Sequence, residues 1–482
     1  MNEVAPTAAT PILELHDVTF AHAAEAAAPC VPVLRHTSLA VPQGAFAVLA
    51  GPTGSGKTTI LRLAMPGLAP AGELSGEVRV LGRDVADATF GNVAIVFQRP
   101  AEQVVCDTVR RELAFGLERQ GLAQAELDLR LAQVCAFLGI EGWLGRKTSE
   151  LSSGELQTLA LASALVLAPR LLLLDEPTAS LDPVAAANLV AQVARANREL
   201  GVTVLVATHA PWLFSAHATM ALSLADGQAQ EVPVEDVAAR PALLASPSAS
   251  PGTDTAEKGV PAREVSLMRG VWLRYGKGFP WVLRDCDLAV MPGRMRALVG
   301  SNGCGKTTLL RVVSGQLRPS RGRVMLPGSI AVLPQDPTLL FCAQTVREEL
   351  VQWAGRDEGA QQAALARAEA MGLASDTLDR HPLDLSDGQR RILALAKLLA
   401  TAPALLLLDE PTRGVDPEAA VVLCQHIASA AAGGASVLVA THDMALVRGI
   451  ADDVSVLFDG RLLDPIPTDD FLAKGRLWGG SL

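Results

Sequence analysis

Two glycine-rich segments are the residues of this chain best suited to bind phosphate. They are 51–58, GPTGSGKT, and 300–307, GSNGCGKT. Closely spaced glycines let backbone N–H groups turn toward an anion, and a helix that follows points its positive end at the same anion. A chance glycine turn would explain one such segment more easily than two. The predicted phosphate-binding residues are Gly51, Gly54, Ser55, Gly56, Lys57, Thr58 and Thr59 in the first half, and Gly300, Gly303, Cys304, Gly305, Lys306, Thr307 and Thr308 in the second.

Each half also has an apolar run that closes on an aspartate and a glutamate. Leu171–Leu174 lead to Asp175 and Glu176, and the same pattern ends the run before Asp409 and Glu410. Two acids at the end of a buried strand are costly unless they face a cation or a reacting water. We expect the aspartates to bind Mg²⁺ together with Thr58 and Thr307, and the glutamates to polarise an attacking water. A capping role at the strand end is the alternative.

A later apolar run in each half ends in a threonine and a histidine, His209 and His442. An imidazole at the end of this strand could contact the terminal phosphate of a nucleotide. A lone Thr-His pair is more often structural, so only the matching position in both halves favours a catalytic role.

The elements that must position these residues recur in the same order in the two halves. Apolar strands Phe46–Ala50 and Met295–Val299 enter the glycine-rich loops, and helical patterns follow at Ala123–Leu138 and Gly359–Met371. Near-continuous apolar strands that alternate with helices predict an α/β fold with a mostly parallel sheet covered on both faces. Because the repeat is long, it indicates domain duplication.

The domain boundaries follow from composition. Residues 238–261 hold four prolines among Ala, Ser, Gly and Thr and cannot bury a core. We therefore expect a first domain at 1–237, a flexible linker at 238–261 and a second domain at 262–482.

Bulk properties exclude several classes of protein. The 482 residues fit two domains, and the net charge of −10 does not favour a broadly basic, nucleic-acid-binding surface. The seven cysteines show no metal-ligand pairing, which is typical of a reduced, cytosolic chain. Met1–Pro11 does not predict a signal peptide, and no stretch of about 18 residues is apolar throughout. A transport role would need separate membrane subunits.

The segments Leu151–Glu155 and Leu385–Gln389 resemble the signature motif of the ATP-binding-cassette (ABC) family. The usual pattern is Leu-Ser-Gly-Gly-Gln, from which the first copy departs at Ser153 and Glu155 and the second at Asp387. The resemblance implies two tandem P-loop NTPase domains, each with a mostly parallel core sheet, a small antiparallel β-subdomain and a helical subdomain. It also implies ATP and Mg²⁺ as cofactors, with Gln98 and Gln335 as further contacts to the metal and the γ-phosphate.

In that family two domains close head to tail, so that each ATP lies between one P-loop and the other domain's signature motif. The resemblance thus assigns Ser386, Gly388 and Gln389 to the first P-loop, and Ser152, Gly154 and Glu155 to the second. A carboxylate at Glu155 would repel a triphosphate unless it is protonated or turned away. We therefore expect unequal sites, with Glu176→Gln lowering turnover more than Glu410→Gln.

The family also stacks adenine on an aromatic residue ahead of the P-loop. Tyr275 fits that place in the second half. The same register gives His22 in the first half, where stacking and a simple loop histidine remain equal alternatives.

The stretches after Gln98 and Gln335 resemble the ATPases of energy-coupling-factor importers, which take up vitamins and transition-metal ions. The resemblance implies integral membrane partners, no nucleic acid, and a peripheral location at the cytoplasmic face of the membrane. The apolar residues expected to form a docking groove are Leu113, Phe115 and Leu117 in the first half and Leu339, Leu340 and Phe341 in the second; burial inside the helical subdomain is the alternative.

Three rival functions stay open. Fused ATPases of sugar importers commonly have one degenerate site, whereas Lys306, Glu410 and His442 are all present. Soluble ABC proteins that act on the ribosome usually have a long, charged linker, unlike residues 238–261. A module that binds ATP without hydrolysing it is disfavoured by both glutamates.

Overall fold

The computed structural model describes residues 11–23, 32–87, 91–118, 120–179, 181–239, 265–326 and 328–474. The chain divides into two compact units, Met1–Arg240 and Pro241–Leu482. The division falls within the predicted linker 238–261, of which only Ala238 and Ala239 belong to the described residues. Ala238 is also the last residue of helix α7 (Val234–Ala238). Residues 1–10, where a signal peptide was not expected, also lie outside the described ranges.

The first unit is built around a six-stranded sheet in the order β10-β9-β3-β8-β7-β6. All neighbouring strands are parallel except β10 and β9. The strands β3, β7 and β8 are buried along their whole length, as their apolar sequences require. The bounds are β3 (Phe46–Ala50), β6 (Val93–Val96), β7 (Leu171–Asp175), β8 (Thr203–Thr208), β9 (Met220–Ala225) and β10 (Gln228–Val232).

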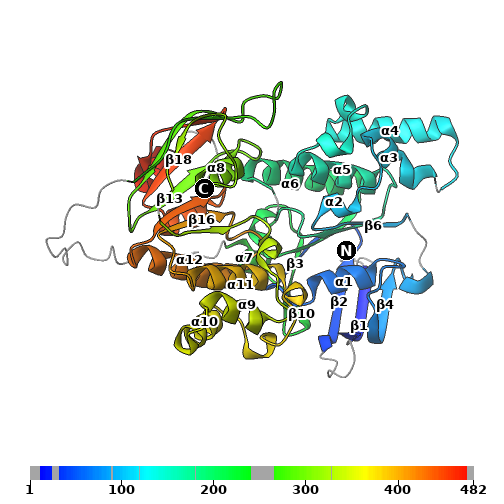
Figure 1. The fold of residues 1–482 in the computed structure, drawn as a ribbon. Coiled ribbons are helices and arrows are strands. Elements are labelled where there is room, and N and C mark those ends of the chain that lie inside the picture. Colours follow the sequence, from blue (N-terminus) through cyan, green and yellow to red (C-terminus); the bar gives the residue numbers. More distant parts are fainter. Residues whose placement is uncertain are drawn as a thin grey trace. The chain divides into compact units, whose positions relative to one another are not determined.

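Helices surround this sheet, and three of them lie together at one end of the unit as a helical subdomain, α3, α4 and α5 (Figure 1). The helix α6 begins after Asp182, whose carboxylate accepts a hydrogen bond from the Ala185 N–H at 2.9 Å. Pro183 at its first position has no N–H to leave unpaired. The bounds are α1 (Lys57–Ala64), α2 (Pro100–Gln103), α3 (Val109–Glu118), α4 (Gln124–Leu138), α5 (Ser153–Leu165) and α6 (Pro183–Leu200).

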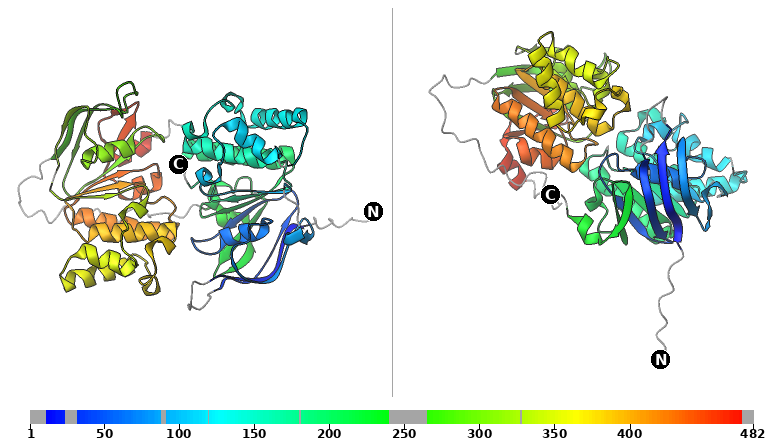
Figure 2. Two further views of the ribbon diagram at one scale, coloured as in Figure 1. Left: turned by 45° about the vertical axis from the view of Figure 1, so that its right-hand side comes forward. Right: turned by 90° about the horizontal axis from the view of Figure 1, so that it is seen from below.

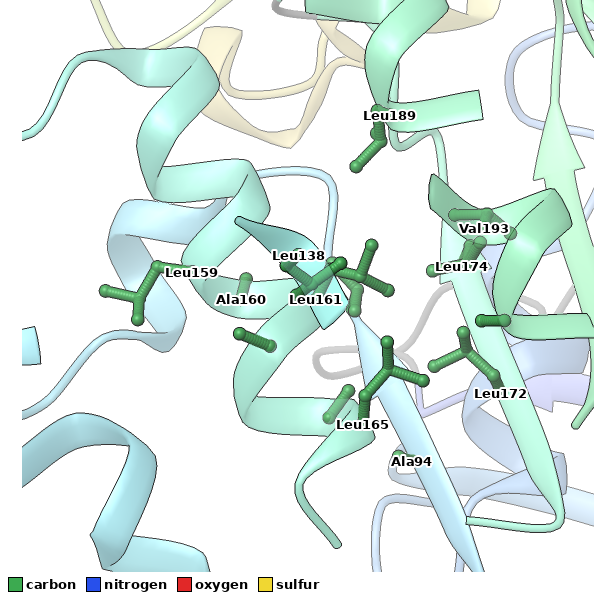
Figure 3. Close-up of a cluster of buried hydrophobic side chains, with 14 of the residues drawn as sticks. Ala94, Leu138, Leu159, Ala160, Leu161, Leu165, Leu172, Leu174, Leu189 and Val193 are labelled. Carbon is green, nitrogen blue, oxygen red and sulfur yellow. The ribbon is translucent and has the colours of Figure 1, made fainter. Parts of the chain in front are cut away.

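The largest core of the first unit lies between α5, α6 and β7. Figure 3 shows Leu161 and Leu165 of α5 pointing toward Leu172 and Leu174 of β7, and all four are buried. Burying one leucine side chain stabilises the fold by about 1.5–3 kcal/mol. This core fixes α5, and therefore the signature-like residues at its start, against the strand that carries Asp175.

The opposite face of the core sheet is covered by α1 and a small antiparallel sheet, in the order β2-β1-β4-β5. Leu13 and Leu15 of β1 belong to the same buried cluster as Ile60 and Leu61 of α1. In the right-hand view of Figure 2 the strands of this sheet run side by side in blue. The bounds are β1 (Pro11–His22), β2 (Pro32–Pro42), β4 (Gly72–Val80) and β5 (Arg83–Asp84).

The second unit repeats this plan. Its antiparallel sheet has the order β12-β11-β14, and its core sheet has the order β15-β16-β17-β13-β18-β19, with β20 paired to β18. Helices α9, α10 and α11 lie together as the second helical subdomain (Figure 1). The strands are β11 (Val265–Leu273), β12 (Leu283–Val290), β13 (Met295–Val299), β14 (Arg321–Val324), β15 (Ile330–Leu333), β16 (Leu405–Asp409), β17 (Ser436–Ala440), β18 (Asp453–Phe458), β19 (Arg461–Leu462) and β20 (Ile466–Pro467). The helices are α8 (Lys306–Val313), α9 (Val346–Ala354), α10 (Glu358–Ala370), α11 (Asp387–Leu399), α12 (Pro417–Ala432), α13 (Met444–Ile450) and α14 (Thr468–Lys474), with the 3₁₀ helix η5 at Pro337–Leu340.

The α/β class and the duplicated architecture predicted from the sequence are confirmed. The strands that enter the glycine-rich loops have the predicted bounds. The helices expected at 123–138 and 359–371 are α4, which begins one residue later, and α10, which begins and ends one residue earlier. Within the described residues no helix combines the length and the apolar character needed to cross a membrane.

Candidate functional site

The first glycine-rich loop joins β3 to α1 and encloses its own lysine. Gly54 and Gly56 have φ values of +85° and +103°, in the left-handed region that favours glycine. A Cβ atom on Gly51 would lie 2.5 Å from the backbone oxygen of Leu224, so no larger residue fits there. The Nζ atom of Lys57 donates to the carbonyls of Gly51 and of the following residue at 2.8 and 2.9 Å.

The second loop has the same geometry between β13 and α8. The Nζ atom of Lys306 donates to the carbonyls of Gly300 and the next residue at 2.7 and 3.2 Å, and Gly303 and Gly305 have φ values of +79° and +110°. Cys304 stands where the first loop has Ser55. Burial raises the pKa of the Cys304 thiol against the opposing charge of Lys306.

One atom of the first loop is an orphaned donor. The Ser55 hydroxyl is buried, and it has no hydrogen-bond partner in the described part of the chain. A buried hydroxyl in this state costs free energy that a phosphate oxygen would recover. The loop thus has the shape and an unused donor for an anion.

The threonine that follows each loop lysine is hydrogen-bonded to the aspartate at the end of β7 or β16. Thr58 donates its hydroxyl to both carboxylate oxygens of Asp175, at 3.0 and 2.9 Å, and Thr307 donates to Asp409 at 2.7 Å. Burial raises the pKa of Asp175 to about 6, although the Thr58 hydrogen bond opposes the shift. Burial likewise raises the pKa of Asp409. In each site burial outweighs the opposing charges of a nearby lysine and arginine, so a bound cation would reduce the cost of the buried carboxylate.

This donor set fits Mg²⁺. A hydroxyl and a carboxylate are hard oxygen ligands, and Mg²⁺ is usually held by one or two carboxylates together with substrate phosphates. In keeping with this, no group of three or more His, Cys, Asp or Glu residues among the described residues could hold a metal ion by itself. Thr58 with Asp175, and Thr307 with Asp409, would hold the ion, whose charge would offset that of the phosphates.

Glu176 is held in place by three neighbours. Its carboxylate lies 2.8 Å from Nδ1 of His209 and 3.7 Å from Nζ of Lys57, and it accepts a 3.2 Å hydrogen bond from the Thr208 hydroxyl. Burial alone would raise the pKa of Glu176, but the hydrogen bond and charge of His209, with the charge of Lys57, outweigh burial and lower it. The carboxylate is therefore ionised and oriented, as a residue that polarises water must be.

Glu410 has the equivalent surroundings in the second unit. It lies 2.8 Å from Nδ1 of His442 and accepts a 3.3 Å hydrogen bond from the Thr441 hydroxyl. Burial opposes the shift, but His442 and then Lys306 lower the pKa of Glu410. Both glutamates have positive φ, +44° for Glu176 and +51° for Glu410, a strained conformation that concentrates at functional sites.

The structure thus brings together, in each unit, the predicted lysine, threonine, aspartate, glutamate and histidine. Gln98 follows β6 and Gln335 follows β15, and the parallel pairing of these strands with β7 and β16 places their ends beside the acids. Thr208 and Thr441, which donate hydrogen bonds to the two glutamates, were not predicted from the sequence. The signal available for them is that a threonine directly precedes the histidine in both halves.

The two residues proposed to stack adenine occupy equivalent positions. Nε2 of His22 lies 3.5 Å from the Thr59 hydroxyl, and the Tyr275 hydroxyl lies 2.9 Å from that of Thr308. Tyr275 is 58% exposed, so a face of its ring is accessible. His22 packs edge-on against Phe20, with ring centroids 5.0 Å apart.

The signature-like residues begin the helices α5 and α11. Ser152 and Ser386 are the N-caps, and Gly154 and Gly388 are the second residues of the helices. Each serine takes part in a capping box, reciprocated by Glu155 in the first unit and Gln389 in the second.

Glu155 has partners within its own domain. Its carboxylate turns back to accept the N–H of Ser152 at 2.8 Å and binds the Arg146 guanidinium at 2.6 Å. Arg146, opposed by partial burial, holds the pKa of Glu155 at about 2. The side chain is thus charged and paired with Arg146, and the unequal turnover of the two sites stays a prediction.

Two of the residues predicted for a docking groove are core residues. Leu113 and Leu117 are fully buried in the main core of the first unit because they share the inner face of α3. Phe115, on the other side of that helix, is 46% exposed, and Leu339 is 74% exposed. Leu340 and Phe341 are partly buried against the core of the second unit.

Comparison with known proteins identifies the family. The sequence model described as ABC transporter matches residues 34–179 and 283–413, which is more than half of the chain and includes both loops and both acidic strand ends.

The chain belongs to the ABC transporter family. Its two units are ABC ATPase domains fused in one chain. A second sequence model, described as an AAA domain, matches residues 144–215 of the first ABC domain.

Similar proteins include bacterial ABC transporter ATP-binding proteins with provisional names. One from Streptomyces coelicolor is 34% identical, and the match covers 91% of this chain and 92% of the relative. One from Bacillus cereus is 31% identical over 93% of this chain and 90% of the relative. A Bacillus subtilis relative, 31% identical over 91% and 89%, has the provisional name HMP/thiamine import ATP-binding protein.

Among solved structures, archaeal ribosome recycling factor aABCE1 in complex with the ribosomal stalk protein aP1 has a TM-score of 0.62 at 21% identity, covering 95% of this chain and 92% of that one. A ribosome-bound complex of archaeal Pelota and ABCE1 gives 0.68 at 20% identity, covering 95% and 80%. At these identities the likeness shows the shared fold.

Proposed function

We propose that this chain is the ATP-hydrolysing subunit of a membrane importer of the energy-coupling-factor type, which takes up a vitamin or a transition-metal ion. Two features support the proposal: the residues that follow Gln98 and Gln335, and the import role in the provisional name of the Bacillus subtilis relative. In this proposal the chain is peripheral and reaches the cytoplasmic face of the membrane through integral membrane partners. The ABC domains are 1–237 and 262–482, joined by a flexible linker at 238–261.

The observation that carries the proposal is exposed apolar surface in the same segment of both domains. Val105 and Phe115 are 65% and 46% exposed in the first domain, and Leu339 and Trp353 are 74% and 38% exposed in the second. These side chains lie between the glutamines and the ends of α3 and α9. Exposed apolar residues flanked by charges favour docking of a partner helix, and their closeness to the strand ends would link that helix to ATP.

The proposal includes two composite ATP sites with Mg²⁺, formed head to tail within one chain. The first combines Lys57, Thr58, Gln98, Asp175, Glu176 and His209 with Ser386, Gly388 and Gln389. The second combines Lys306, Thr307, Gln335, Asp409, Glu410 and His442 with Ser152, Gly154 and Glu155. In each site the lysine and the glycine-rich loop bind phosphates, the aspartate and threonine bind the metal, and the glutamate, oriented by the histidine, polarises water.

Charge substitutions in the exposed segments test the docking role. The variant Phe115→Asp with Leu339→Asp should lose its membrane subunits on purification and lose uptake, because a carboxylate cannot enter an apolar contact without a partner. ATP binding should be unchanged, since the loops are untouched. The matched control is Leu200→Asp, at the end of α6, where the leucine is 51% exposed.

A retained membrane complex with normal uptake would contradict the importer assignment. Sedimentation of the wild-type chain with ribosomes instead of membranes would contradict it as well and would favour the ribosome-acting alternative. A normal complex whose cargo is a sugar would replace the energy-coupling-factor assignment by the sugar-importer one.

A further inference from the structure

An arginine near the start of α11 is buried beside the catalytic glutamate of the second domain. The side chain of Arg391 is 6% exposed. One terminal nitrogen of its guanidinium donates to the carbonyl of Glu410 at 2.9 Å, and the other donates to the carbonyl of Gln335 at 3.0 Å. Its Nε is buried and has no partner among the described residues.

These two carbonyls belong to the ends of neighbouring strands. Gln335 follows β15 and Glu410 follows β16, and the two strands are parallel, with Leu333 opposite Leu408. The planar guanidinium donates to the two strand ends through two different nitrogens held in a fixed fork, a geometry that the single nitrogen of a lysine does not provide. Arg391 therefore joins the glutamine loop to the strand end that carries the water-polarising glutamate.

The hydrogen bond from Arg391 constrains the backbone of Glu410. Glu410 has φ +51°, a conformation that a residue with a side chain adopts only when its surroundings enforce it. The hydrogen bond from Arg391 is one such constraint on its peptide group. Burying a cation here is costly, and burial, with the charge of Arg413, lowers the pKa of Arg391 to about 10.

The first domain has no equivalent bridge. The matching position on α5 is Gln157, which is 2% exposed, and its Nε2 is buried without a partner in the described part of the chain. The glutamine side chain is shorter than that of arginine, and its amide nitrogen donates to neither carbonyl. Among the described residues, Glu176 and Gln98 are thus not tied to each other through the amide nitrogen of Gln157.

We propose that Arg391 is a positioning residue of the second ATP site, which couples the glutamine loop at Gln335 to the backbone of Glu410 so that metal sensing and water activation move as one unit. The proposal rests on the proposed roles of Gln335 and Glu410. Because Arg391 binds the backbone carbonyls of Gln335 and Glu410, its loss leaves both residues less well positioned. Their proposed roles differ: Gln335 senses the metal, and Glu410 activates the water. The dependence on Mg²⁺ and the catalytic rate change together, while ATP binding at the loop does not.

The test compares Arg391→Gln, which copies the residue of the first domain, with Arg448→Gln, an exposed arginine on α13, in the full-length chain. We measure ATPase rate against Mg²⁺ concentration, and the affinity for a fluorescent ATP analogue without Mg²⁺. Loss of a partner that orients metal-site residues typically costs about 10–100-fold in metal affinity or activity. We expect about a tenfold higher half-maximal Mg²⁺ concentration and a lower kcat for Arg391→Gln, with unchanged analogue affinity, and wild-type behaviour for Arg448→Gln.

Two further measurements separate this role from a structural one. In Arg391→Lys the charge is kept but the fork is lost, so the Mg²⁺ dependence should remain shifted. Photolabelling with 8-azido-ATP and vanadate, resolved by half of the chain after cleavage, should show the higher Mg²⁺ requirement in the second half only.

Three results would overturn the proposal: an unchanged Mg²⁺ dependence in folded Arg391→Gln, full recovery by Arg391→Lys, or equal shifts in both halves. If Arg391→Gln does not fold, the Mg²⁺ dependence of Arg391→Lys and the photolabelling of each half of that variant still test the proposal. An ATPase that needs Lys57 and Lys306 but not Arg391 would leave the proposed function intact and reject this inference.

Discussion

At the scale of single residues, adjacent carboxylates in each site have opposite pKa shifts. Asp175 and Glu176 are both buried, yet burial dominates for the aspartate and raises its pKa, whereas His209 and Lys57 overcome burial for the glutamate and lower its pKa. The difference follows from the partners: the Thr58 hydroxyl and the charges of Lys57 and Arg62 do not outweigh burial at Asp175, whereas His209 lies 2.8 Å and Lys57 3.7 Å from the Glu176 carboxylate. The proposed water-polarising group is therefore kept charged, while burial raises the pKa of the proposed metal-binding group.

This difference predicts a pH-dependent instability of the unliganded first domain. The pKa of Asp175 is about 6 in the folded chain and 3.8 in the reference state, so between these pH values the unfolded chain releases the proton first. Stability falls as pH rises through this window, and above pH 6 the loss is complete, about 3 kcal/mol for a shift of about two units. The variant Asp175→Asn removes the effect.

The measurement is the free energy of unfolding without nucleotide or metal at pH 4 and pH 7. The gap between Asp175→Asn and wild type should widen with pH in favour of the variant. The exposed carboxylate variant Asp128→Asn is the control and should follow the wild type. Parallel curves for Asp175→Asn and wild type would show that the carboxylate is not destabilised by burial.

At the scale of elements, a buried ion pair joins α9, α11 and η5 in the second domain only. Lys397 and Glu349 are both fully buried and bonded to each other, and Lys397 also donates to the carbonyl of Leu340. The Trp353 ring lies 4.7 Å from the Lys397 ammonium. The matching residue of α5 is Ser163, whose hydroxyl is buried without a partner among the described residues, while Glu112, which matches Glu349, accepts hydrogen bonds from the backbone N–H groups of Val105 and Cys106.

The second domain should therefore be far more sensitive at this position. In Lys397→Met the buried carboxylate of Glu349 loses its charged partner and keeps only hydrogen bonds such as those from the Cys342 and Ala343 N–H groups. Removing one partner of a buried ion pair costs about 3–5 kcal/mol. The matched change Ser163→Ala should be nearly neutral or slightly stabilising, because it removes an unpaired hydroxyl. Urea unfolding of both variants measures the difference.

A rescue variant completes this comparison. Lys397→Met combined with Glu349→Gln removes both charges and should recover much of the lost stability. Equal losses in the single and double variants would show that packing of the lysine stem, rather than charge, stabilises this junction.

The sequence predicted single residues and strand ends better than it predicted contacts between elements. The loops, the strand ends and the histidines could be predicted because their spacing along the chain encodes them. The contact of Glu155 with Arg146, nine residues earlier, and that of Arg391 with Gln335, 56 residues earlier, could not, because each depends on how a preceding loop folds back against a helix. Leu113 and Phe115 are two residues apart on one helix, so only the phase of α3 against the core decides which is buried.

At the scale of the whole molecule, one chain carries two sets of the residues proposed to form nucleotide sites. The sets have nearly the same internal geometry, but the supporting helices differ: α11 contributes Arg391 and Lys397 where α5 has Gln157 and Ser163. Arg391 and Lys397 thus give the second domain additional hydrogen bonds and an ion pair around its site. These differences concern the supporting helices, and each P-loop retains its lysine and threonine.

The central claim is that both P-loop sites together account for ATP hydrolysis. The most direct measurement is the Mg²⁺-dependent ATPase rate of wild type, Lys57→Ala, Lys306→Ala and the double variant, each checked for folding. Both lysines lie against their loop carbonyls in the same geometry, so each single variant should lose most of its site's contribution. The account predicts no hydrolysis above background in the double variant, and full activity in that variant would contradict it.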